Sequence, residues 1–185
     1  MRAFIAMDMD DQKVRSSIMA FQEQIASAGA DLKIVDAQNL HFTLLFLGEI
    51  SEEEASLIVG KLSEIRLSSF GVEFTGTGVF PSPHRINVIW VGVDAGSQAK
   101  LKQVADEVVS SLSGLRFKPD KQFEPHLTVA RVKSGRERDK LLEVIRDSAG
   151  MKFGTQLFTE FKLKKSDLTS SGPIYTDLQR FKLGE

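Results

Sequence analysis

Apolar residues in this chain follow two periodicities, one typical of strands and one of helices. Apolar, β-branched-rich runs between turn residues predict strands at 2–7, 32–35, 40–47, 86–93 and 126–132. Alternation also predicts strands at 70–77, 115–117, 155–164 and 175–183. Helical spacing of apolar residues predicts four helices, with apolar stripes at Val14–Ile25, Leu57–Leu62, Leu101–Leu112 and Leu141–Ile145. Strands and helices therefore alternate along the whole chain.

The order of the predicted elements repeats. A short strand, a polar turn, an apolar strand and a capped helix occur near 32–65 and again near 115–149. The links before the apolar strands are too short for a helical crossover, which favours antiparallel sheets. We therefore expect an α+β fold with two lobes. Each lobe has an antiparallel sheet with outer helices and a central motif strand, and a pseudo-twofold relates the lobes about a central cleft. No linker divides the chain, so 1–185 is predicted to be one two-lobed domain.

Composition and charge narrow the function. The 185 residues carry a formal net charge of -1, so contact with a polyanion must be local. There are no cysteines, which excludes thiol nucleophiles and disulfide scaffolds and fits a reducing compartment. The N-terminal residues do not resemble a signal peptide, and no apolar run approaches a membrane span. We expect a cytoplasmic protein without a membrane partner.

Two of the three histidines are each followed by a threonine at the second position. His41-Phe42-Thr43 and His126-Leu127-Thr128 both lie on predicted strands. Side chains alternate in a strand, so each motif presents an imidazole and a hydroxyl on one face, while Phe42, Leu44, Phe46, Leu127 and Val129 are expected in the core. A single His-x-Thr is more often structural, but two such similar strands predict a four-group phosphate site.

These four groups can perform acid–base chemistry on a phosphodiester. Unperturbed histidine titrates near 6.5, so one imidazole can activate water while the other protonates the leaving oxygen. Each threonine hydroxyl can donate to a phosphate oxygen and stabilise developing charge. The motifs lack the spacing of a helical metal-binding histidine pair and contain no carboxylate, so we expect neither a metal nor a cofactor.

The two motifs, together with the residues that flank them, resemble the signatures of a known family. Asn39–Glu49 and Pro125–Lys133 resemble the paired HxTx signatures of the two-histidine phosphoesterase superfamily, and most closely those of the RNA 2',3'-cyclic phosphodiesterases formerly called 2'-5' RNA ligases. Similarity to that family covers nearly the whole chain. The supporting stretches are Arg2–Ala6, Gly78–Pro81, Val88–Gly92, Lys165–Thr169 and Gly172–Tyr175.

The resemblance implies a bilobed α+β fold and hydrolysis of a terminal 2',3'-cyclic phosphate to a 2'-phosphomonoester. By position, His41 would protonate the departing 3' oxygen, and His126 would activate water. Thr43 and Thr128 would hold the phosphate. The family also ligates or cleaves 2'-5' linkages weakly and reversibly without ATP. The implied partners are RNA ends or small nucleotides in RNA processing, and we expect a monomer.

Further substrate contacts are weaker hypotheses. Arg131 belongs to the second family signature, but its strand parity is opposite to that of His126 and Thr128. It would need a β-bulge or a strand end to reach the phosphate; otherwise it forms a structural ion pair. Arg85 and His84, on a predicted exposed double-proline loop at 80–85, could touch an RNA backbone, although such residues are more often only solvated. Phe4, Phe46 and Trp90 could stack on a base, although core packing is the more frequent role of such side chains.

Two alternative functions remain at this point. The first is a phosphodiesterase for a small cyclic or 2',5'-linked nucleotide, which pocket width and basic surface would distinguish. The second is a non-catalytic module that binds RNA ends and keeps the fold. That module predicts no loss of function when His41 or His126 is replaced by alanine, whereas the enzyme predicts losses of orders of magnitude.

Overall fold

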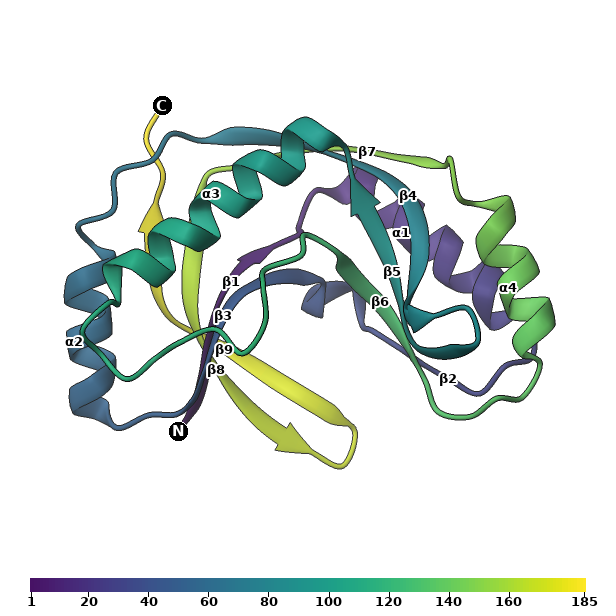
Figure 1. Ribbon diagram of the computed structural model, residues 1–185, viewed down its shortest axis with the longest axis horizontal. Coiled ribbons are helices and arrows are strands. Elements are labelled where there is room, and N and C mark those ends of the chain that lie inside the picture. Colours follow the sequence, from purple (N-terminus) through teal and green to yellow (C-terminus); the bar gives the residue numbers. More distant parts are fainter.

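The computed structural model describes all 185 residues and contains four α-helices and two antiparallel sheets (Figure 1). Sheet A has the strand order β3-β1-β8-β9, and sheet B has the order β2-β6-β5-β4-β7. The strands of sheet A are β1 (Arg2–Asp8), β3 (His41–Glu49), β8 (Glu160–Thr169) and β9 (Gly172–Lys182). The strands of sheet B are β2 (Leu32–Ile34), β4 (Phe70–Ser82), β5 (Arg85–Val93), β6 (Leu127–Val132) and β7 (Lys152–Phe158). The predicted α+β fold with two antiparallel sheets is confirmed.

The helices cover one face of each sheet and leave the other face for the two motifs. Helices α1 (Gln12–Ala26) and α4 (Arg138–Asp147) pack on sheet B, while α3 (Ala95–Ser111) packs on β3 and on α2 (Glu52–Leu62). Each end of the molecule in Figure 1 therefore has its own helix pair. We call the two faces without helices the inner faces. None of the four helices has the length and apolar character that crossing a lipid bilayer requires.

A single core joins the two sheets. Its 41 buried apolar residues come from both sheets and all four helices. Phe42 of sheet A stacks on Phe74 of sheet B with 5.7 Å between ring centroids, and it also contacts Phe158. Burial of this continuous apolar surface holds the lobes in a fixed arrangement. At the start of β3, Phe42 therefore packs in the core, while its neighbour His41 faces away from it.

Two predicted loops are parts of hairpins. Residues 80–82 belong to β4, and only Pro83 and His84 form the turn to β5. Pro81 is accommodated because this half of β4 pairs only with β5, so its missing N–H leaves no ladder bond unmade. Residues 166–173, expected to join the predicted strands 155–164 and 175–183, likewise belong to the β8–β9 hairpin, whose turn is formed at 170–171. Both segments contain polar residues and a proline, a composition typical of loops, because these strand ends are exposed.

Two other predictions about strands are wrong. The predicted strand at 155–164 is divided at Thr159, where the chain passes from sheet B to sheet A without a turn residue. The predicted strand at 115–117 is absent except for an isolated bridge between Ser113 and Leu115. There, a side-chain bond from Arg116 Nη2 to the Glu49 carbonyl oxygen, at 2.7 Å, connects the loop to the end of β3.

The repeat predicted that both motif strands are central in their sheets, and this prediction is wrong for one of them. β3 is an edge strand of sheet A, while β6 lies between β2 and β5 in sheet B. The short strand β2 precedes β3 in the chain but pairs with β6 in the other sheet. The chain therefore crosses between lobes within each half. Sequence order alone does not reveal this exchange, because the connecting turns are equally short in either arrangement.

Candidate active site

The ring of His41 is held at the start of β3 by two hydrogen bonds. Its Nδ1 lies 2.6 Å from the carbonyl oxygen of Asn39, and its Nε2 lies 3.0 Å from Oγ1 of Thr43. A carbonyl oxygen only accepts, so Nδ1 carries the proton of the neutral ring. Phe4 and Tyr175 flank the imidazole, each at 5.3 Å between centroids. Nε2 is therefore the nitrogen that exchanges a proton, beside the Thr43 hydroxyl.

A β-bulge follows Thr43 and changes which side chains share the face of His41. Successive residues of β1 pair with Thr43 and Leu45, so Leu44 is the extra residue. The prediction that Phe46 lies in the core is therefore wrong. The bulge brings Phe46 to the inner face, where it is 64% exposed. An apolar ring at this exposure is available to stack on a ligand.

His126 immediately precedes β6 and is surrounded by aromatic rings. Its centroid lies 4.0 Å from that of Trp90 and 4.9 Å from that of Phe80. Its Nδ1 is buried without a hydrogen-bond partner, and the closest carboxylate oxygen, on Glu124, is 3.8 Å away. Tilted and edge-on packing against these two rings, rather than a side-chain hydrogen bond, therefore orients this imidazole. Phe80 and Trp90 act here as packing partners of a histidine.

A matching bulge in β6 follows Thr128. Successive residues of β5 pair with Thr128 and Ala130, so Val129 is the extra residue. Arg131 consequently lies on the inner face with Thr128. The β-bulge that Arg131 needed to reach this face is thus present. It occupies the same place relative to His126 that Phe46 occupies relative to His41.

Gln22 of α1 holds the bulge of β6 in place. Its side-chain amide donates to the carbonyl oxygens of Val129, at 3.0 Å, and of Val35, at 2.8 Å. The N–H of Val35 also donates to the Val129 carbonyl oxygen at 3.0 Å. Gln22 is only 6% exposed, so its polar atoms would be costly without these partners. The sequence pattern did not identify this residue, because it occurs as one polar position within an apolar helix stripe.

The two inner faces approach one another near the motifs. β3 and β6 are in contact, and the positive charge of Arg131 on β6 acts on both His41 and Tyr175 of sheet A. Lys33 pairs with Arg131 across β2 and β6, and its Nζ extends close to Gly172 at the tip of the β8–β9 hairpin. His41, Thr43, His126, Thr128 and Arg131 therefore belong to facing surfaces of neighbouring strands.

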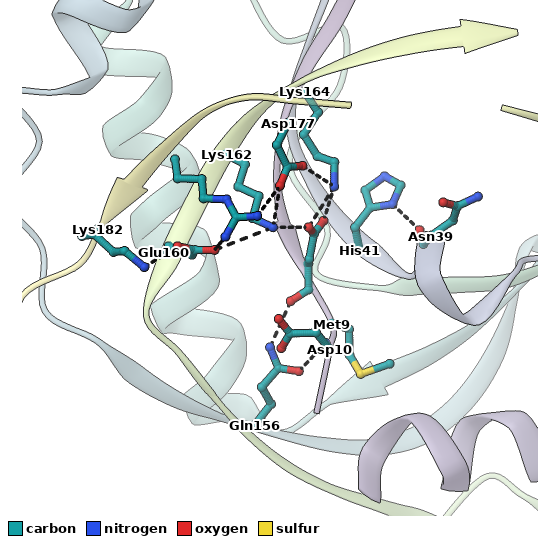
Figure 2. Close-up of polar contacts among 12 residues, drawn as sticks. Met9, Asp10, Asn39, His41, Gln156, Glu160, Lys162, Lys164, Asp177 and Lys182 are labelled. Atoms are coloured by element: carbon teal, nitrogen blue, oxygen red, sulfur yellow. Dashed lines mark hydrogen bonds and ion pairs between the residues drawn. The ribbon is translucent and has the colours of Figure 1, made fainter. Parts of the chain in front are cut away.

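A buried charge cluster lies beside His41 on the inner face of sheet A (Figure 2). Asp8 accepts hydrogen bonds from Lys162 Nζ at 2.8 Å and from Lys164 Nζ at 2.8 Å. Asp177 is 3.0 Å from the first ammonium and 3.2 Å from the second. The lysine side chains are only 10% and 7% exposed, so each depends on these carboxylates for its charge. No group of three or more His, Asp or Glu side chains is arranged as a metal site.

Burial lowers the pKa of both histidines, but their surroundings differ. For His41, the Asn39 carbonyl and the charge of Asp8 act in the opposite direction and favour the imidazolium, while Lys164 and Arg131 add to the lowering. For His126, only the charge of Glu124 opposes the effect of burial. A carbonyl acceptor and a carboxylate suit His41 to hold a proton. The aromatic surroundings suit His126 to remain neutral.

Gly78 provides a way to test how His126 is positioned. A Cβ at Gly78 would overlap the ring of Trp90, which packs against His126. We expect Gly78→Ala to lower the free energy of unfolding by about 1–3 kcal/mol through overpacking. A displaced histidine should also lower kcat by about tenfold or more. Gly96→Ala, in a position where a Cβ meets nothing within 4 Å, serves as the control in denaturant and rate measurements.

The remaining predicted contacts lie elsewhere. Arg85 is exposed at the start of β5, and His84 is exposed in the β4–β5 turn, so neither is placed beside the histidines. Sequence reasoning missed Asp8, Lys164 and Tyr175, which contact or flank His41. Asp8 and Lys164 had no sequence signal except their place at a strand end or in polar–apolar alternation, and Tyr175 had only its place in a stretch that resembles the family. Such a signal does not distinguish a buried charge from a solvated one.

Comparison with known proteins gives consistent matches over the full chain. Residues 3–183 match the family model described as "AKAP7 2'5' RNA ligase-like domain". A protein of Archaeoglobus fulgidus named RNA 2',3'-cyclic phosphodiesterase is 39% identical over 98% of this chain and 99% of its own length. A protein of the same name from Aeropyrum pernix is 40% identical over 87% of this chain and 92% of its own length.

Solved structures show the same fold. TT0787 of Thermus thermophilus superposes with a TM-score of 0.83 at 30% identity, with all of both chains covered. LigT of Escherichia coli complexed with 3'-AMP superposes with a TM-score of 0.81 at 26% identity, over 100% of this chain and 98% of that chain. The bilobed arrangement of two sheets is thus shared with these proteins.

Proposed function

This chain belongs to the 2'-5' RNA ligase-like family of two-histidine phosphoesterases, whose curated relatives are RNA 2',3'-cyclic phosphodiesterases, and on that premise we propose that it hydrolyses RNA 2',3'-cyclic phosphate ends to 2'-phosphomonoesters without a metal ion. The observation that carries this proposal is the pair of His-x-Thr motifs on facing inner surfaces, each followed by a bulge in the same place. LigT of Escherichia coli, solved in complex with 3'-AMP and with phosphate, supports a nucleotide phosphate as the ligand.

The proposed mechanism divides acid and base between the two imidazoles. Neutral His126 takes a proton from water as the oxygen attacks phosphorus, and protonated His41 gives its Nε2 proton to the departing 3' oxygen. The P–O3' bond breaks as the new P–O bond forms, which leaves the phosphate on the 2' oxygen. The Asn39 carbonyl keeps the Nδ1 proton of His41 in place, so that only Nε2 transfers a proton.

The hydroxyls and Arg131 complete the proposed site. Thr43 and Thr128 donate to non-bridging oxygens, and Arg131 adds a positive charge from the β6 side. Thr43 is already within 3.0 Å of His41 Nε2, so acid and anchor act at neighbouring atoms. The same groups support weak reversible 2'-5' ligation, in which a ribose hydroxyl replaces water and no ATP is needed.

A single copy of the chain supplies both motifs. The shared core of 41 residues supports 1–185 acting as one two-lobed domain and as a monomer. No partner contributes to the proposed reaction apart from the RNA end or nucleotide. A cytoplasmic location fits a substrate of this kind.

The proposal is tested with an oligonucleotide that ends in a 2',3'-cyclic phosphate, incubated with and without EDTA. We expect a 2'-phosphate product at a rate that EDTA does not change. A 3'-phosphate product would contradict the assigned leaving oxygen and the histidine roles. Loss of activity in EDTA that added metal restores would contradict metal-independent hydrolysis. Tight binding without turnover would favour an RNA-end-binding module.

A further inference from the structure

Four cations lie together at the end of sheet B where β6 finishes and β2 and β5 begin, and none has a carboxylate partner. They are Lys33, Arg85, Arg131 and Lys133, which we call the basic end. Lys33 and Arg131 face each other across β2 and β6, and Arg85 and Lys133 are exposed. All of the ion pairs nearby are made by other residues. These charges therefore do not stabilise the fold through pairing and remain available to an anion.

A cavity of about 630 Å³ opens beside the basic end. Arg85 and Lys133 line one side, and the loop 134–137 with the first turn of α4 lines the other. Five lysine or arginine side chains line this cavity against two carboxylates, although the whole chain has a net charge of -1. Both carboxylates, Glu137 and Asp139, are already paired with cations of the same lining. The cavity is therefore locally cationic.

β6 connects this cavity to the proposed phosphate site. Thr128 lies at one end of the strand, Arg131 follows on the same face, and Lys133 lies just beyond its last residue. At about 3.3 Å per residue, Lys133 is at most about 16 Å from Thr128. That distance corresponds to a few nucleotides of an RNA strand rather than to a single nucleotide.

We infer that the basic end and its cavity bind the backbone of the RNA on the 5' side of the cyclic phosphate. This inference deepens the proposed function and rests on it: the terminal phosphate lies between the histidines, and the preceding phosphates follow β6 to Lys133 and Arg85. Unpaired cations on a rigid strand attract phosphates without reading bases. The enzyme is therefore specialised for RNA chains and acts less well on cyclic mononucleotides.

The test compares two substrates and one charge-reversed variant. Arg85→Glu/Lys133→Glu should lower kcat/KM by about tenfold or more for a 12-nucleotide RNA ending in a 2',3'-cyclic phosphate at low salt. The same variant should hydrolyse 2',3'-cyclic CMP at the wild-type rate. The slope of log(kcat/KM) against log[salt] for the RNA should become shallower by about 1.4, as expected for two lost contacts to single-stranded phosphates.

Lys100→Glu is the matched control, because Lys100 is an exposed cation on α3, away from β6. Fluorescence anisotropy with a labelled 12-nucleotide RNA measures binding without turnover. Weaker RNA binding in the double variant alone would support the basic end even if the wild type hydrolysed neither substrate, in which case only the proposed function would fail. Equal RNA binding and hydrolysis in the double variant and the control would overturn the inference. Equal losses on RNA and cyclic CMP would also overturn it.

Discussion

Alanine at His126 or at His41 is expected to lower kcat/KM for an RNA 2',3'-cyclic phosphate by about 10²- to 10⁴-fold, the range that a positioned general acid or base contributes. No neighbouring side chain can replace either imidazole. Asp8 is engaged by two lysines, and Glu124 lies 3.8 Å behind His126, on its Nδ1 side. The double variant should lose little more than the worse single variant, because the two groups act in one proton-transfer step. Steady-state rates on the same oligonucleotide measure all three.

The pH dependence of kcat/KM distinguishes the histidine that acts as the acid from the one that acts as the base. The wild-type kcat/KM should fall at low pH as His126 is protonated and at high pH as His41 loses its proton. Burial lowers the pKa of both groups below the ordinary value of about 6.5, so the optimum should lie on the acid side of that value. His126→Ala should remove the acid limb of the residual activity, and His41→Ala should remove the alkaline limb.

His84→Ala is the natural control, since the third histidine is exposed in the β4–β5 turn. On 2',3'-cyclic CMP, which does not reach the cavity beside the β4–β5 turn, it should retain the wild-type rate and pH profile. Exchange of the limbs between the two active-site variants would reverse the acid and base assignments. Retention of more than a tenth of the wild-type rate by either variant would contradict catalysis by paired imidazoles.

The sequence was sufficient to predict the two motif strands because each carries its pattern within a few residues. Strand alternation placed His41 with Thr43 and His126 with Thr128, and the structure agrees at both places. For the residues after each threonine, strict alternation predicted the wrong face of the strand. A β-bulge costs only one extra residue and has no distinctive composition here, so the inward positions of Phe46 and Arg131 could not be predicted.

The pairing of strands that are distant in the sequence could not be predicted either. The short link between β2 and β3 favoured an antiparallel sheet, but β2 pairs with β6 from the other half of the chain. Similarly, nothing local indicates that Lys162 and Lys164 are buried. Their alternation with Phe161 and Leu163 resembles a strand with one solvated face. The two carboxylates that both lysines share, Asp8 and Asp177, come from β1 and β9, more than ten positions away.

We expect the largest change in stability from a substitution in this buried charge cluster. Asp8→Asn keeps the shape of the side chain but removes the charge that Lys162 and Lys164 share. Lys162 would then keep only Asp177 and Glu160 as carboxylate partners, and Lys164 would keep only Asp177. We expect the free energy of unfolding at neutral pH to fall by about 3 kcal/mol, as when a buried ion pair loses one partner. Chemical denaturation measures this change, with exposed Asp10→Asn as the neighbouring control.

The same substitution should also reach the active site. Asp8 raises the pKa of His41, so its loss should move the alkaline limb of kcat/KM to lower pH, in addition to any loss of stability. A second change, Lys164→Met, removes one of the ammonium groups that Asp8 neutralises and should restore part of the stability of Asp8→Asn. Equal stability of Asp8→Asn and Asp10→Asn would show that the cluster does not hold this lobe together. An unmoved alkaline limb would show that the charge of Asp8 does not act on His41, and the cluster would then stabilise the sheet without tuning the acid.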